Sequence, residues 1–122
     1  MTARVLIAED EENIAESLSF ILRRDGFEVD GVSDGASALN RVRGGRFDLL
    51  MLDVMLPAMN GFEVLKNLRA DAALRDLPVV VVSAKAQAQD RELAASFGVQ
   101  AYVTKPFSNR EVVDLVRRLT AR

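Results

Sequence analysis

Short apolar runs recur along the chain at fairly regular spacing. The most apolar of them are rich in Val, Leu and Ile and show little alternation between polar and apolar positions. Strands that are buried on both faces of a parallel sheet have this pattern. Five strands are therefore predicted, at residues 4–8, 28–32, 49–53, 79–83 and 101–105.

Helical periodicity fills the segments between these runs. In segment 12–26 the apolar residues fall on one helical face, and Gly26 follows them as a stop. Asn60 and Ser108 are each followed three residues later by a glutamate, which is the spacing of a capping box. Five helices are therefore predicted, at residues 12–26, 34–45, 60–70, 88–98 and 108–122.

The alternation of strands and helices favours an α/β fold in which helices cover both faces of one sheet. Right-handed crossovers leave few arrangements, and a doubly wound, five-stranded parallel sheet of order 2-1-3-4-5, the flavodoxin-like order, fits best. The chain length suits a single domain over residues 1–122. Sites in such sheets lie beyond the carboxyl ends of the strands, here between the first and third strands.

The amino-acid composition excludes several kinds of functional site. The sequence has no Cys and no His, which excludes disulfides, thiolate metal sites and imidazole catalysis. The net charge of -2 gives no reason to expect direct nucleic-acid binding. No apolar run approaches the ~20 residues of a membrane span, and the start lacks a long apolar signal segment. We therefore expect a cytoplasmic protein without membrane contact.

Carboxylates gather where the predicted strands end. Glu9 and Asp10 follow the first strand, and Asp53 ends the third. Three carboxylates at one sheet edge repel one another, so they must raise their pKa values or find a cation. Oxygen-only ligands favour Mg²⁺, or Mn²⁺ in its place.

A hydroxyl and an ammonium complete this edge. Ser83 ends the fourth strand, and Lys105, followed by Pro106, ends the fifth. With a metal they form a set suited to a phosphoryl group, so we predict attack by an Asp53 oxygen on phosphorus in an in-line transfer. Each residue also has a structural reading, as a helix-start acid, a turn former or a solvated charge. Convergence on one sheet edge favours the functional reading.

These residues lie in segments that resemble the receiver domain of two-component response regulators. The segments are AEDEE, LDVMLPAMNG, VVVSAKA and AYVTKPF, and the resemblance covers essentially the whole chain. It implies that Asp53 is the phosphoacceptor and that Asp10 binds Mg²⁺ directly. It also implies that Glu9 acts through a metal-bound water and that Met55 offers its backbone carbonyl to the metal.

The same resemblance assigns the phosphoryl side of the site. Ser83 takes the place of the family's Thr/Ser that bonds a phosphoryl oxygen, and Lys105 contacts another oxygen. Lys105-Pro106 is similar to the family's cis peptide. Tyr102 resembles the switch aromatic, although a half-buried core tyrosine is the alternative.

The resemblance implies a signalling domain rather than an enzyme. It would take a phosphoryl group from a sensor histidine kinase or a histidine phosphotransfer protein in a Mg²⁺-dependent step, and lose it slowly by itself. Phosphorylation would then reshape the face formed by the fourth helix, fifth strand and fifth helix, which would signal to an effector protein or domain or form a homodimer.

Some features depart from the family or leave alternatives. Gln100 and Ala101 stand where winged-helix transcription factors of this family often have two acids, which puts their charged dimer interface in doubt. The last predicted helix has arginines that are expected to form a solvated face, with a partner surface as the alternative: Arg110, Arg117, Arg118 and Arg122. The sequence includes no output domain, which fits a stand-alone receiver or part of a longer regulator.

Two other functions fit the sequence less well than that of a receiver domain. A haloacid dehalogenase-type phosphatase needs a general acid two residues after its nucleophile, where this chain has Met55. A pure interaction module would not need the complete set of site residues.

Overall fold

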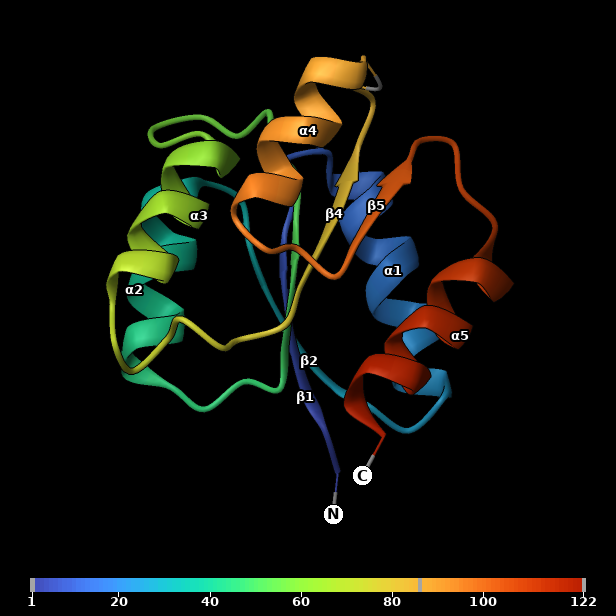
Figure 1. The fold of residues 1–122 in the computed structure, drawn as a ribbon. Coiled ribbons are helices and arrows are strands. Elements are labelled where there is room, and N and C mark those ends of the chain that lie inside the picture. The colour runs from blue at the N-terminus through green and yellow to red at the C-terminus, as the bar shows by residue number, and fades with distance from the viewer. Residues whose placement is uncertain (1, 86, 122) are drawn as a thin grey trace.

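Five strands alternate with five helices in the computed structural model, which describes residues 2–85 and 87–121 (Figure 1). The elements are β1 (Arg4–Ala8), α1 (Glu12–Arg24), β2 (Glu28–Val32), α2 (Gly35–Gly44), β3 (Leu49–Leu52), α3 (Gly61–Ala70), β4 (Val79–Ser83), α4 (Ala88–Ser96), β5 (Ala101–Thr104) and α5 (Asn109–Thr120).

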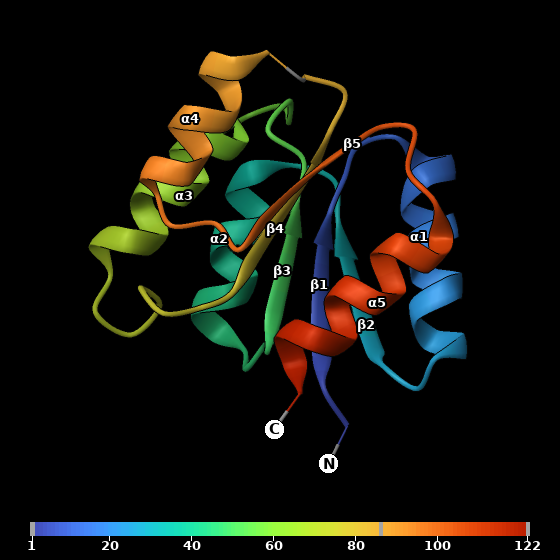
Figure 2. The same ribbon diagram turned by 45° about the vertical axis from the view of Figure 1, so that its right-hand side comes forward.

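The strands form one parallel sheet of order β2-β1-β3-β4-β5, which confirms the predicted topology. Helices α1 and α5 cover one face, and α2, α3 and α4 lie on the other side (Figure 2). Ala8 is in register with both Val32 and Leu52, so β1, β2 and β3 end at the same level. The residues that follow these strands therefore meet at one edge of the sheet.

The core consists of two apolar layers, one on each face of the sheet. Along β1, Val5 and Ile7 pack with α1 and α5, whereas Leu6 and Ala8 pack with α2 and α3. Successive side chains of a strand point to opposite faces. Because helices cover both faces, β3 and β4 are buried at every position, which is why their sequences show no polar alternation.

Local signals account for several helix ends. Asn60 Oδ1 accepts a hydrogen bond from Glu63 N–H at 3.0 Å, and Ser108 Oγ accepts one from Glu111 N–H at 3.0 Å. Both predicted caps are thus confirmed. Gly26 has φ +96°, a conformation that glycine adopts without steric cost, and α1 ends just before it.

Two strands end one residue earlier than predicted. β3 stops at Leu52 and β5 at Thr104, so Asp53 and Lys105 lie in the loops that follow. Asp53 N–H still donates to Ala8 O at 3.0 Å, and Lys105 N–H donates to Ser83 O at 3.0 Å. These bonds hold both residues beside the sheet while their side chains are free to turn toward the edge.

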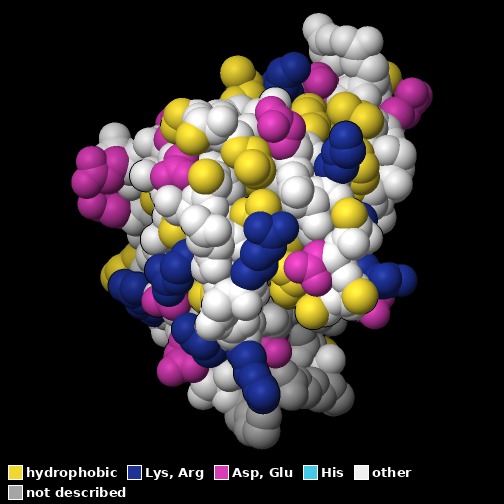
Figure 3. Space-filling view, turned by 90° about the vertical axis from the view of Figure 1, so that its left-hand side faces the viewer, with side chains coloured by type: hydrophobic (Ala, Val, Ile, Leu, Met, Phe, Trp, Pro, Cys, Tyr) yellow, Lys and Arg dark blue, Asp and Glu magenta, His cyan; other side chains and the backbone are white. Residues whose placement is uncertain are grey.

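The outer surface of α2 and α3 is charged. Lys and Arg side chains are interspersed there with Asp and Glu, and apolar side chains are scattered (Figure 3). Ion pairs join Arg41 to Asp30 at 2.8 Å and Arg43 to Asp71 at 3.8 Å. Among the described residues, every helix is too short or too polar to cross a bilayer.

A close backbone contact joins α2 to the loop after β3. Gly35 N–H donates to Pro57 O at 3.3 Å, and a Cβ at Gly35 would lie 1.6 Å from Met59 O. No side chain fits there. At the other end of the loop, a Cβ at Gly61 would lie 2.7 Å from Asp53 O. These two glycines thus let the loop fold closely against its neighbours and determine its path away from Asp53.

Gly35→Ala is expected to lower the free energy of unfolding by roughly 1–3 kcal/mol or more, because the added methyl overlaps backbone that must move. Gly44→Ala, at the opposite end of the same helix, is the matched control. A Cβ there meets no atom within 4 Å. That variant should gain about 0.4–1 kcal/mol from reduced freedom of the unfolded chain. Urea denaturation measures both, and equal changes would contradict the close contact.

Candidate functional site

Three carboxylates meet at the carboxyl edge of the sheet, between β1 and β3. One oxygen from each of Glu9, Asp10 and Asp53 lies within 4.8 Å of the others. Their backbones are held by the sheet, since Glu9 N–H donates to Val32 O at 3.0 Å and Asp53 N–H donates to Ala8 O at 3.0 Å. The predicted cluster at the point where the winding reverses is therefore present.

Lys105 lies against the two buried members of this cluster. Glu9 and Asp53 are 3% and 4% exposed, whereas Asp10 is open to solvent. Lys105 Nζ lies 2.6 Å from Glu9 Oε1 and 2.9 Å from Asp53 Oδ2. In the sheet, β4 separates β5 from the neighbouring strands β1 and β3, so this ammonium connects the end of β5 with the ends of β1 and β3.

Burial and contact with opposite charges shift the pKa values of Glu9 and Lys105 in opposite directions. Burial raises the pKa of the Glu9 carboxyl, and contact with Lys105 only partly offsets this. Burial alone would lower the pKa of the Lys105 ammonium, but its contacts with Glu9 and Asp53 prevail and raise it. One ammonium therefore serves two buried carboxylates, and the site keeps a negative charge that a further cation would stabilise.

The donor atoms fit a small divalent cation. Glu9 Oε1 is buried and accepts no hydrogen bond of acceptable geometry, so its contact with Lys105 is an ion pair only. Asp10 adds a carboxylate that water reaches. Oxygen donors of this kind, with room for water, match the preference of Mg²⁺ and also suit Mn²⁺.

The Asp53 side chain is held in one orientation. Asp53 Oδ1 accepts a hydrogen bond from Met55 N–H at 2.9 Å, and Oδ2 faces Lys105. Met55 thus contributes its amide to this site, whereas its side chain is exposed. The peptide bond between Lys105 and Pro106 is cis.

Ser83 is fully buried at the end of β4, between the strands that carry Asp53 and Lys105. Its Oγ accepts a hydrogen bond from Lys85 N–H at 3.2 Å. The hydroxyl proton is not used in that bond. The Ser83 hydroxyl also interacts with the Tyr102 hydroxyl, an interaction that acts to lower the pKa of Tyr102.

Tyr102 is linked to the same loop from β5. Its hydroxyl donates to Lys85 O at 2.6 Å, and the Arg91 guanidinium lies 4.9 Å from the ring centre. Burial and the negative charge of Asp90 raise the pKa of the Tyr102 hydroxyl. The half-buried ring thus connects the loop after Ser83 with α4.

Two further residues contact the residues of this site, and neither was predicted from the sequence. Glu11 Oε1 lies 3.2 Å from Lys105 Nζ. Asp90 is 7% exposed and pairs with Lys85 at 3.3 Å. Glu11 stands in an acidic run and Asp90 in a polar helix segment, so neither differs in sequence from an ordinary solvated charge.

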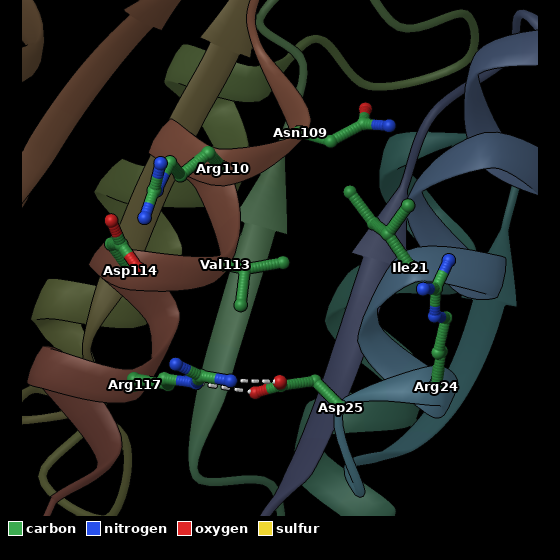
Figure 4. A pocket seen from close by; sticks show the side chains of 8 residues that line it. All are labelled: Ile21, Arg24, Asp25, Asn109, Arg110, Val113, Asp114 and Arg117. Atoms are coloured by element: carbon green, nitrogen blue, oxygen red, sulfur yellow. Dashed lines mark hydrogen bonds and ion pairs between the residues drawn. The ribbon is translucent and has the colours of Figure 1, made fainter.

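A separate hollow lies between α1 and α5, away from the carboxylate cluster (Figure 4). Ile21 and Val113 point toward one another across it, and a two-pronged ion pair between Asp25 and Arg117 closes one end. This pairing lowers the pKa of the Asp25 carboxyl. Arg117 is exposed, as expected of a solvated arginine face, and its ion pair with Asp25 also joins α5 to α1. Arg122, at the end of that predicted helix, lies outside the described residues.

Glu9→Gln is expected to raise the free energy of unfolding of the metal-free protein at neutral pH, because the folded state then no longer holds an ionised buried carboxylate. The raised pKa means that the folded state binds the Glu9 proton more tightly than the unfolded state. The cost of ionising Glu9 is therefore absent when the pH lies below its pKa in the unfolded state. This cost grows as the pH rises through its higher pKa in the folded state.

The stability gap between Glu9→Gln and the wild type should thus widen from acid to neutral pH. Urea denaturation in a chelating buffer between about pH 4 and about pH 8 measures it. The exposed Glu16→Gln serves as control and should show no such trend. A stability gap that narrows toward neutral pH would contradict the raised pKa of Glu9 in the folded state.

Similarity to known proteins agrees with this geometry. The response regulator receiver domain family matches residues 5–117. The sensory transduction protein RegX3 of Mycolicibacterium smegmatis is 42% identical over 118 residues, which cover 97% of this chain and 50% of RegX3. The DNA-binding response regulator MtrA of the same organism is 42% identical over 117 residues, covering 96% and 50%. The chain thus spans about half the length of these relatives.

Solved structures with the same fold extend the comparison. The chemotaxis protein CheY4 of Vibrio cholerae has a TM-score of 0.90 at 27% identity, covering 98% of this chain and 99% of that one. The receiver domain of the sensor histidine kinase PA1611 from Pseudomonas aeruginosa has a TM-score of 0.91 at 27% identity and full coverage of both chains. Its structure has a magnesium ion coordinated in the active site cleft. With its carboxylate cluster, its fold and these matches, the chain belongs to the response regulator receiver domains of two-component systems.

Proposed function

We propose that residues 1–122 act as one receiver domain in which Asp53 accepts a phosphoryl group in a Mg²⁺-dependent step. The donor is the phosphohistidine of a sensor histidine kinase or of a histidine phosphotransfer protein. One observation carries this proposal, namely that the buried Asp53 carboxylate lies with Glu9 and Asp10 oxygens within 4.8 Å and Lys105 Nζ at 2.9 Å. A nucleophile, the ligands of a cation and a fixed positive charge thus share one edge.

The proposed transfer forms a bond between an Asp53 carboxylate oxygen and phosphorus while the bond from phosphorus to the histidine nitrogen breaks. The Met55 amide and the Lys105 ammonium hold the two Asp53 oxygens, so the carboxylate is oriented before the donor arrives. Mg²⁺, when bound, neutralises charge on the carboxylates and on the phosphoryl oxygens.

Two side chains would then hold the transferred group. Lys105 would offer its ammonium to one phosphoryl oxygen, and the Ser83 hydroxyl, whose Oγ accepts from Lys85 N–H, would donate to another. Asp10 would bind Mg²⁺ directly, Glu9 through a water, and Met55 through its carbonyl. Slow loss of the phosphoryl group to water would reset the domain without any partner.

A phosphatase of the haloacid dehalogenase type is not favoured. Such an enzyme would need a proton donor two residues after the nucleophile, and Met55 has none to offer. Met55 has a thioether and no carboxyl group, and its side chain is exposed. A signalling domain that is modified on its own aspartate needs no such acid.

The switch is proposed to run through Ser83 and Tyr102. A phosphoryl group that draws the Ser83 hydroxyl inward would pull on Lys85, whose amide bonds Ser83 Oγ and whose carbonyl bonds the Tyr102 hydroxyl. Tyr102 and the α4–β5–α5 face would then shift together. Because the phosphoryl group interacts better with one of two arrangements, it shifts their populations.

The proposed partners are the phosphodonor protein and a downstream effector protein or domain, with a phosphorylation-dependent homodimer as one output. MtrA is named a DNA-binding response regulator, and this chain spans half of it. We propose no direct nucleic-acid contact for residues 1–122, whose net charge is -2. A cytoplasmic location is proposed because sensor kinases deliver the phosphoryl group there.

Mg²⁺ is expected to stabilise the wild-type protein by about 2.7 kcal/mol at a hundredfold excess over its dissociation constant, because it binds only the folded site. Asp10→Asn should remove most of this gain, since it takes away an accessible ligand. Asp76→Asn, at an exposed position outside the cluster, is the control. Thermal or urea unfolding with and without Mg²⁺ measures the effect, and equal gains in both variants would refute the metal site.

Acetyl phosphate with Mg²⁺ is expected to add one phosphoryl group that hydroxylamine removes, as an acyl phosphate requires. Asp53→Asn should abolish the label, and Lys105→Ala should slow labelling or uncouple it from the conformational change. Lys66→Ala on the exposed side of α3 should label normally. Intact mass measurement follows the reaction, and a label retained by Asp53→Asn would place the acceptor elsewhere.

A further inference from the structure

The Lys105 ammonium has three carboxylates around it. An ammonium has three N–H donors. Three carboxylates lie against Lys105 Nζ: Glu9 at 2.6 Å, Asp53 at 2.9 Å and Glu11 at 3.2 Å. Lys105 Nζ donates hydrogen bonds to Glu11 and Asp53, and its contact with Glu9 is an ion pair. A phosphoryl oxygen that binds Lys105 closely therefore competes with carboxylates that are already in contact with the ammonium.

Glu11 is the carboxylate that can leave. Its side chain is 58% exposed, whereas those of Glu9 and Asp53 are 2% and 4% exposed. Its contact with Lys105 is also the longest of the three. Water can replace Lys105 as the partner of an exposed carboxylate at little cost, but cannot do so for a buried one.

The side chain of Glu11 is not needed for its own helix. Glu11 precedes α1 at the N-cap position, yet its side chain makes no capping hydrogen bond. Its backbone N–H donates to Glu9 Oε2 at 3.0 Å, which keeps the residue beside the site. The carboxylate is turned to Lys105 instead, the cation that the phosphoryl group also needs.

We propose that Glu11 is a specificity-determining residue that occupies the phosphoryl position on Lys105 and so disfavours small, free phosphodonors. The inference rests on the proposed phosphorylation of Asp53. A free acyl phosphate must displace the Glu11 carboxylate and also approach its negative charge. A donor protein with a basic side chain beside its phosphohistidine can pair with the displaced carboxylate, which offsets both effects.

The test compares labelling rates with acetyl phosphate at saturating Mg²⁺. Glu11→Gln should react about two- to fivefold faster than the wild type, the factor that an exposed ion pair is worth. Glu11→Asp keeps the charge but loses reach to Lys105, and it should also react faster than the wild type. Glu12→Gln, in the first turn of α1, removes an adjacent exposed charge and should react at the wild-type rate.

Ionic strength provides a readout that a purely structural role would not move. At about 1 M salt the screening length falls to about 3 Å, so the rates of Glu11→Gln and the wild type should converge. A difference that persists unchanged at high salt would overturn an electrostatic role for Glu11.

The outcomes separate this inference from the proposed function. If the wild type and Glu12→Gln are labelled but Glu11→Gln is no faster, the role of Glu11 is overturned alone. Equal acceleration by Glu12→Gln, or a wild-type rate in Glu11→Asp, would show a general charge effect and overturn it as well. If the wild type is not labelled on Asp53, the proposed acceptor fails and this inference fails with it.

Discussion

The contact of one ammonium with two buried carboxylates dominates the carboxyl edge of the sheet. Lys105 lies within 2.9 Å of both Glu9 and Asp53, which come from strands on different sides of the switch point. Burying a carboxylate is costly without a cation, and burial raises the pKa of the Glu9 carboxyl. Lys105 supplies one positive charge for two carboxylates, and a further cation would offset the negative charge that remains.

The rest of the edge follows from that constraint. The sheet order places Ser83 between Asp53 and Lys105. Close backbone contacts at Gly35 and Gly61 determine the path of the loop after β3. Tyr102 connects the loop after Ser83 to α4 through Lys85 and Arg91. Direct contacts thus join the loop after Ser83 to β5 and α4.

Much of this could be predicted because it depends on local patterns. Buried runs without alternation placed the strands, capping residues placed the helix starts, and side chains at the strand ends pointed to Asp53, Ser83 and Lys105. The misses have a different origin. The ion pair of Asp25 and Arg117 joins residues 92 positions apart, and nothing near either residue distinguishes it from a solvated charge. The contact of Glu11 with Lys105 is of the same kind.

The sequence by itself determined the fold class, the strand order and the set of polar side chains at the carboxyl edge of the sheet, because hydrophobic periodicity and strand ends are local properties. Only the tertiary structure decided which charges are paired, how deeply each is buried and which carboxylate can be displaced. Glu9 and Glu11 are both acids near the end of β1, yet one is buried and the other exposed. Desolvation depends on every element packed around a side chain, and that information is not present in the residue or its neighbours.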